Sequence, residues 1–146
     1  MATIKDALEQ LNDKSVRHIV SISGGKDSAA LAVHMKDKYP QIPVEYVFCD
    51  TGCELPETYE FIERLEALLG VSVIKVSIYD ILKIPKKSRI SAFDYMLKEL
   101  YGDYLPSVRA RWCTGALKIK PFEHFVGSGT AYSYIGIRDD EDREGY

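Results

Sequence analysis

The sequence has few of the residues that build disulfide frameworks and metal sites. Its 146 residues include three cysteines, Cys49, Cys53 and Cys113, and three histidines. An odd cysteine count argues against a disulfide framework. Without a Cys-x-x-Cys pair, a structural zinc site is not expected either. Cys53 and Cys113 each lie inside a segment with other candidate functional residues, so they stay candidates as single thiols.

Long apolar runs and a strong charge imbalance are also absent. No segment approaches the length of a membrane span, and the N-terminus lacks the apolar stretch of a secretion signal. A net charge of −3 creates no overall field that would attract nucleic acid. The apolar fraction of 46% is typical of a globular protein. We therefore expect one cytoplasmic domain spanning 1–146, with no membrane partner and no nucleic-acid partner indicated by charge.

Strands and helices are predicted to alternate along the chain. Strands are expected at 17–21, 44–49, 71–78 and 131–137. Helices are expected at 4–12, from the first glycine turn to 38, at 56–69, between 91 and 101, and at 116–126. This alternation predicts the α/β class, with a mainly parallel, twisted sheet and helices on both faces forming a three-layer domain. Ligands of such folds bind beyond the carboxyl ends of the strands.

The most informative segment is a glycine turn between the first strand and the next helix. It consists of Ser23, Gly24, Gly25, Lys26, Asp27 and Ser28. Without a Cβ, glycines let a phosphate approach the backbone closely, and a helix N-terminus attracts anions. A lysine and a serine hydroxyl suit a pyrophosphate. An ordinary capped turn is the alternative, but the Ser-Gly-Gly-x-Asp-Ser pattern favours a phosphate loop.

A second polar segment follows the second expected strand. Asp50, Thr51 and Gly52 stand between that strand and the helix that begins at Pro56. Ordinary loop and capping chemistry would explain these residue types. Their place at a strand end favours contact with an adenosine. Alternatively, Asp50 or Glu54 is a candidate oxygen ligand for Mg²⁺.

Two further segments carry cations near the end of the chain. Arg111-Trp112-Cys113-Thr114 precedes Lys118, and Gly136-Ile137-Arg138 leads to Arg143. A buried tryptophan at a helix start and a solvated charged turn are the plain alternatives. Guanidinium groups are suited to phosphate or sulfate, so Arg111, Arg138 and Arg143 are candidate anion ligands.

In this order, the four segments resemble those of the phosphoadenosine phosphosulfate (PAPS) reductase family, within the PP-loop ATP pyrophosphatases. That family also includes the nucleotide-binding subunit of sulfate adenylyltransferase and the sulfur-transfer proteins of DNA phosphorothioation. The resemblance implies an adenine nucleotide α-hydrolase-like fold in which the PP-loop holds pyrophosphate or sulfate. Lys26, Lys118, Arg138 and Cys113 are the implied catalytic residues, and Arg111 and Arg143 are implied nucleotide contacts.

The resemblance leaves three functions open. The first is attack on the α-phosphate of ATP with release of pyrophosphate, in the presence of Mg²⁺. The second is thiol-dependent reduction of an adenylyl sulfate by Cys113 or Cys53, and the third is nucleotide binding without turnover. A sulfur-carrier, thioredoxin-like or sulfur-transfer protein is an implied partner, and a homo-oligomer stays open.

The family pattern also differs from this chain near its end. The chain stops at Tyr146, within a charged motif after which relatives continue, and it lacks their Glu-Cys-Gly-type motif. Three thiols cannot supply the four ligands of an iron–sulfur cluster, so none is expected within this chain. A minimal family member and the N-terminal portion of a longer protein are both compatible with this pattern.

Overall fold

Strands and helices alternate in the structure much as the hydrophobic pattern predicts. The computed structural model describes residues 3–84 and 90–137. Its strands are β1 (Arg17–Ile22), β2 (Val44–Cys49), β3 (Ile74–Val76) and β4 (Ala131–Tyr134). Its longer helices are α1 (Ile4–Glu9), α2 (Lys26–Lys38), α3 (Pro56–Leu69) and α7 (Lys120–Val126). Among the described residues, no helix is long and apolar enough to span a membrane.

The four strands form one parallel sheet in the order β3-β2-β1-β4. His18 pairs with Val44 of β2 on one side and with Tyr132 of β4 on the other. Strands β1 and β2 are parallel neighbours, and α2 lies between them in the chain, so the three elements form a β-α-β unit. The predicted α/β class with a mainly parallel sheet is therefore confirmed.

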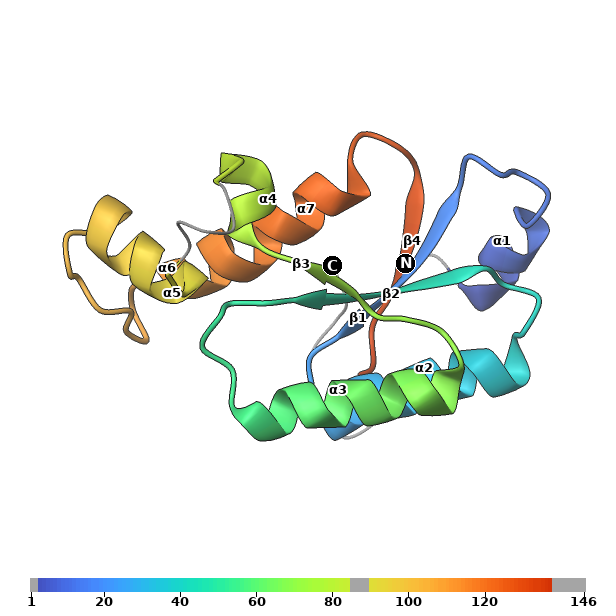
Figure 1. Ribbon diagram of the computed structural model, residues 1–146. Helices are drawn as coiled ribbons and strands as arrows, with labels where there is room; N and C mark the ends of the chain where they lie inside the picture. The colour runs from blue at the N-terminus through green and yellow to red at the C-terminus, as the bar shows by residue number, and fades with distance from the viewer. Residues whose placement is uncertain (1–2, 85–89, 138–146) are drawn as a thin grey trace. The chain divides into compact units, whose positions relative to one another are not determined.

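The chain divides into two compact units, and each is described by itself. Unit 1 comprises residues 1–48, 57–74 and 128–146, and unit 2 comprises residues 49–56 and 75–127. In unit 1, α2 and α3 lie side by side on the same face of the sheet (Figure 1). The expectation of a single domain over 1–146 stays a prediction.

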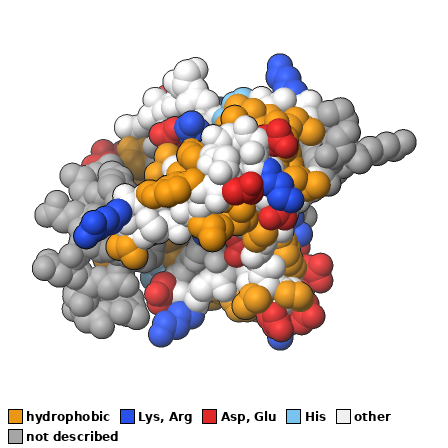
Figure 2. Space-filling model, turned by 90° about the vertical axis from the view of Figure 1, so that its left-hand side faces the viewer, with side chains coloured by type: hydrophobic (Ala, Val, Ile, Leu, Met, Phe, Trp, Pro, Cys, Tyr) orange, Lys and Arg blue, Asp and Glu red, His pale blue; other side chains and the backbone are white. Residues whose placement is uncertain are grey.

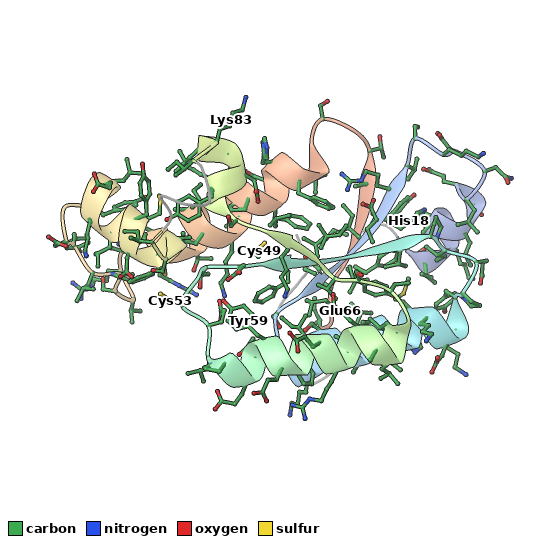
Figure 3. All side chains as sticks on the ribbon, in the orientation of Figure 1. His18, Cys49, Cys53, Tyr59, Glu66 and Lys83 are labelled. Atoms are coloured by element: carbon green, nitrogen blue, oxygen red, sulfur yellow. The ribbon has the colours of Figure 1, made fainter. Side chains whose placement is uncertain are left out.

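The core of unit 1 lies between the sheet and these two helices. Buried side chains from β1 and β2, such as Val20, Ile22 and Phe48, pack against Ala32 of α2 and Ile62 of α3. Tyr59 and Glu66 extend from α3 on the side that faces the sheet (Figure 3). The ring of Tyr59 meets Phe48 edge to face, and the carboxylate of Glu66 accepts a hydrogen bond from the Val73 amide at 2.6 Å.

Unit 2 is helical in the part of the chain that the structure describes. It contains α4 (Ile78–Leu82), α5 (Ala92–Tyr95), η2 (Met96–Leu100), α6 (Trp112–Thr114), η3 (Gly115–Ile119) and α7. Segments η2 and η3 are π-helical turns, which commonly occur at functional sites. Its buried core gathers Ile78, Tyr79, Ala92, Met96, Ala116 and Leu117.

Several element bounds differ from the sequence prediction. The first helix was expected over 4–12, but α1 ends at Glu9. The third strand was expected over 71–78, but β3 covers only Ile74–Val76, because Ser77 caps a helix that begins at Ile78. The last strand ends at Tyr134 rather than at residue 137. The final helix begins at Trp112, before the expected residue 116, and continues through η3 into α7. Pro121 is tolerated because it lies in the first turn of α7.

Candidate functional site

The Ser23–Ser28 loop lies in unit 1 and is ordered by its own two serines. The Ser28 hydroxyl accepts a hydrogen bond from the Ser23 amide at 3.1 Å and donates one to the Gly25 carbonyl at 3.1 Å. The Ser23 hydroxyl accepts a bond from the Gly25 amide at 3.3 Å. These bonds fold the loop tightly around the start of α2, where an anion would meet the backbone N–H groups.

Helix α2 begins without a side-chain cap. Gly25 is its N-cap residue and has no side chain to offer, so no side-chain hydrogen bond caps this helix. Most helices begin with a residue whose side chain satisfies one free N–H group. In this 13-residue helix, no N-cap side chain occupies the first N–H groups, which lie next to the exposed Lys26. This is the arrangement that an anion-binding helix N-terminus requires.

Gly24 must be glycine for two independent reasons. Its φ of +75° lies in the left-handed region, which side-chain-bearing residues rarely adopt. A Cβ built on it would lie 2.6 Å from the Thr58 methyl carbon in α3. The start of α3 therefore packs directly against the glycine turn.

The segment after β4 also reaches this loop. A Cβ on Gly136 would lie 2.9 Å from the backbone carbonyl oxygen of Asp27. The first and last predicted motifs thus meet within unit 1, as the carboxyl ends of parallel strands should. Arg138 and Arg143, which follow Gly136, lie outside the described residues.

The Asp50–Cys53 loop belongs to unit 2 and is closed by internal hydrogen bonds. The carboxylate of Asp50 accepts a bond from the Gly52 amide at 2.8 Å. The buried Thr51 hydroxyl donates to the carboxylate of Glu54 at 2.9 Å, so the loop itself uses that hydroxyl. Thr51 is held further by its carbonyl, which accepts a bond from the Phe93 amide at 3.0 Å.

Gly52 fits this loop tightly against the start of α5. Its φ is +72°, and a Cβ there would lie 2.9 Å from the Ala92 backbone nitrogen. Backbone cannot move aside as a flexible side chain can. The sequence singled out Gly52 as part of a strand-end loop, and the structure supplies the steric reason for it.

The described residues form no preformed metal cage. No group of three or more histidine, cysteine, aspartate or glutamate side chains converges in the part of the chain with described coordinates. Mg²⁺ commonly binds through one carboxylate together with substrate phosphates. Asp50 fits such a role only as a single ligand, and this role stays a prediction.

Arg111 and Lys118 are both exposed and stand on one continuous helical segment of unit 2. Arg111 precedes α6, and Lys118 lies within the π-helical turn η3. Between them, Trp112 stacks on Tyr101 with 4.2 Å between ring centroids, and its indole N–H donates to the Tyr104 carbonyl at 2.9 Å. The tryptophan thus anchors the segment while leaving both cations in solvent.

The three cysteines have different environments. Cys53 is exposed, whereas Cys49 and Cys113 are half-buried (Cys49 and Cys53 in Figure 3). Burial raises the pKa of the Cys49 thiol to about 11, although the positive charge of Lys118 partly opposes this shift. Cys113 packs against the core of unit 2.

A hydrogen-bonded chain connects Cys53 to a carboxylate. The Cys53 thiol donates to the Ser91 hydroxyl at 3.4 Å, and that hydroxyl donates to the carboxylate of Asp94 at 2.7 Å. Ser91 and Asp94 stand in the segment where the sequence predicted only a helix between 91 and 101. Nothing in their spacing indicates the contact with Cys53, which depends on how the loop folds.

The structure therefore groups the predicted site residues into two sets. Ser23–Ser28 and Gly136 come together in unit 1. Asp50, Thr51, Gly52, Arg111, Cys113 and Lys118 belong to unit 2. A joint site made from both sets stays a prediction.

Comparison with known proteins decides the family. The model of the phosphoadenosine phosphosulfate reductase domain matches residues 17–145, from β1 past the last described residue. The chain belongs to this family.

Several curated proteins resemble this PAPS reductase-family chain. An uncharacterized nin region protein of Escherichia phage lambda is 35% identical, over 85% of this chain and 49% of that protein. An uncharacterized protein of Methanocaldococcus jannaschii is 31% identical, over 82% of this chain and 22% of that protein. A phosphoadenosine 5'-phosphosulfate reductase of Alteromonas mediterranea is 37% identical, over 50% of this chain and 33% of that protein. The chain thus spans half or less of the length of these relatives.

Proposed function

We propose that this chain is an adenine nucleotide-binding enzyme of sulfur metabolism that acts at the α-phosphate of ATP and releases pyrophosphate. The observation that carries the proposal is the start of α2, where a glycine turn precedes a helix with no side-chain cap. Family membership adds the adenine nucleotide as the expected ligand.

The backbone amides, Lys26 and Ser28 have different roles in this proposal. The amides at the start of α2 would hold the pyrophosphate, and Lys26 would neutralise its charge. Ser28 keeps the loop closed through its bonds to Ser23 and Gly25. Lys118 and Arg111 would contact other anionic groups of the nucleotide, as would Arg138 and Arg143.

The reaction follows from this placement of charge. An acceptor oxygen or sulfur would attack the α-phosphorus, the bond to the bridging oxygen would break, and pyrophosphate would leave. Catalysis would come from positioning and from cationic groups that stabilise the developing negative charge. Mg²⁺ would enter with ATP as part of the substrate, and Asp50 is the carboxylate proposed to meet it.

Calorimetric titration with Mg–ATP tests nucleotide binding. Lys26→Ala and Ser28→Ala should each weaken the affinity about tenfold or more, because each removes a charge-assisted or loop-ordering interaction. Lys14→Ala, an exposed lysine in the turn before β1, is the matched control and should bind normally. Unchanged affinity in both loop variants would remove the basis of the proposal.

A second candidate function is thiol-dependent reduction of an adenylyl sulfate. Two observations favour it: the reductase of Alteromonas mediterranea is a relative, and the exposed Cys53 thiol is hydrogen-bonded to Ser91. A thiolate would attack the sulfonyl sulfur, and the sulfur–oxygen bond would break to release the nucleotide. A second thiol, from a thioredoxin-like partner, would then release sulfite and form a disulfide. Cys113 is the other candidate nucleophile.

One set of product assays separates the candidates. The protein is incubated with Mg–ATP, and in parallel with adenylyl sulfate or its 3'-phosphate plus a dithiol. Pyrophosphate identifies the first activity. Sulfite that disappears in Cys53→Ser or Cys113→Ser identifies the second. Nucleotide binding with no product would mark the chain as a binding module that needs a sulfur-carrier or sulfur-transfer protein.

A further inference from the structure

Gly136 lies against the first turn of α2 in unit 1. A Cβ built on it would lie 2.9 Å from the Asp27 carbonyl oxygen and 3.3 Å from the Asp27 carbonyl carbon. The Cβ of Leu31, about one turn further along the helix, would be 3.7 Å away. Gly136 therefore approaches the helix backbone itself, and the contact leaves no room for a side chain.

The carbonyl that Gly136 meets belongs to the peptide unit that also carries the Ser28 amide. A peptide unit is planar and moves as one body, so a push on the Asp27 carbonyl oxygen also displaces the Ser28 N–H group. That N–H lies in the first turn of α2, where N–H groups have no partner within the helix. In the proposed function, these are the groups that hold the pyrophosphate.

Both sides of this contact are anchored. On the strand side, Tyr134 stands two residues before Gly136, and its hydroxyl lies 2.8 Å from Nδ1 of the buried His18. On the loop side, the Ser28 hydroxyl accepts a hydrogen bond from the Ser23 amide at 3.1 Å. Since neither side is free to move away, a Cβ at position 136 would disturb the start of α2.

We propose that Gly136 is a positioning residue for nucleotide binding. It supports the peptide between Asp27 and Ser28, so that the Ser28 N–H stays available to the pyrophosphate. Gly136 acts through the helix backbone rather than through a contact of its own with the ligand. The inference rests on the proposed function, because it requires the anion to bind at the start of α2. It adds that the segment after β4 helps to determine the geometry of this site.

Calorimetric titration with inorganic pyrophosphate and with Mg–ATP tests this role. Gly136→Ala should weaken both affinities about tenfold or more, because a misplaced N–H loses a charge-assisted hydrogen bond. Gly129→Ala is the matched control and should bind normally. Gly129 precedes β4 as Gly136 follows it, neither glycine has a positive φ, and a Cβ at Gly129 would meet nothing within 4 Å.

A merely structural role of Gly136 would give a different result. It would lower the free energy of unfolding in urea but leave the affinity of the folded protein unchanged. Circular dichroism identifies the temperature at which Gly136→Ala is fully folded, and the titrations are made there. Unchanged affinity in folded Gly136→Ala overturns the inference.

The Lys26→Ala variant separates this failure from that of the proposed function. If the wild type binds both ligands and Lys26→Ala weakens binding while Gly136→Ala does not, the inference alone fails. If the wild type binds neither ligand, the proposed function fails and the inference fails with it.

A second measurement uses the wild type and does not depend on how the variant folds. In amide NMR spectra recorded during titration with pyrophosphate, the resonances of Ser28 and Gly136 should shift together with the same midpoint. A shift at Ser28 without one at Gly136 would show that the two positions are not coupled and would overturn the inference.

Discussion

The thiol of Cys49 donates a hydrogen bond to the backbone carbonyl of Lys118, with 3.4 Å between sulfur and oxygen. The acceptor lies in the π-helical turn η3, where the regular helical hydrogen-bond pattern is altered. The bond therefore fixes the backbone that carries a predicted anion-binding lysine. It also assigns Cys49 a structural role, because the raised pKa keeps this thiol protonated at neutral pH.

The rate at which each cysteine is alkylated should depend on the exposure and the pKa of its thiol. Iodoacetamide at neutral pH should modify the exposed Cys53 first, and Cys49 about tenfold or more slowly, since both burial and protonation protect it. Mass spectrometry of the digested protein at successive times measures each rate. In denaturant the difference should disappear. Equal rates in the folded protein would contradict the environment described for Cys49.

Gly24→Ala should destabilise the protein by about 1–2 kcal/mol from backbone strain alone. The contact with the Thr58 methyl group adds to this cost. Gly70→Ala is a useful comparison, because Gly70 has a similar φ of +67° but open space around it. Urea denaturation measures the free energy of unfolding of both variants. The difference between them separates the cost of the contact with Thr58 from the cost of backbone strain.

A second substitution sharpens the same test. Thr58→Ser removes the methyl group that an added Cβ would meet, so Gly24→Ala should be better tolerated in that background than in the wild type. Two results together would contradict the close packing of α3 on the glycine turn. Gly24→Ala would lower the free energy of unfolding no more than Gly70→Ala does, and Thr58→Ser would not reduce that loss.

Local sequence signals predicted the parts of the structure that depend on neighbouring residues. The glycine turn, the strand over 44–49 and the helix that begins at Pro56 all follow from short patterns, and the structure confirms them. The third strand was predicted too long because an apolar run at 71–78 does not distinguish a strand from a helix start. Ser77 and Asp80 form a capping box there and begin α4.

Features that depend on packing could not be predicted in this way. The π-helical turns have no known sequence pattern of their own, and the bond from Cys49 to Lys118 spans 69 positions. Residue types and spacing indicated that Ser23–Ser28 binds an anion, but they could not show that Thr58 and Gly136 enclose this loop.

Trp112 offers a direct optical test of the predicted contact at Arg111. It is the single tryptophan of the chain, and it lies between Tyr101 and Phe93 in a ring stack. A nucleotide that binds the neighbouring Arg111 should change its emission, whereas Arg111→Ala should reduce the change and weaken binding. Titration with Mg–ATP, followed by fluorescence, measures both. A normal response in Arg111→Ala would remove Arg111 from the predicted site.

The stability of unit 1 should fall on mild acidification because of His18. This residue is 2% exposed, and its ring stacks on Tyr132, with Nδ1 2.8 Å from the Tyr134 hydroxyl (His18 in Figure 3). Burial lowers its pKa from 6.5, so the unfolded chain takes up a proton in a range where the folded chain does not. The free energy of unfolding should therefore decrease as the pH falls below about 6.5, by at most about 1.4 kcal/mol per pH unit for one proton.

Urea denaturation at pH 7.5 and at pH 5.5 measures this effect. His18→Gln keeps a group that can bond to Tyr134 but does not titrate, so its loss of stability between the two pH values should be smaller. The hydrogen bond from Arg17 lowers the pKa of the Glu45 carboxyl. The stability that this ion pair contributes is therefore lost only under more acidic conditions. His124→Gln is the control, because His124 is exposed on α7 of unit 2. Acidic side chains are spread over the face of the molecule that Figure 2 shows, so the difference between the variants carries the test. An equal pH dependence in the wild type and His18→Gln would show that other groups cause it.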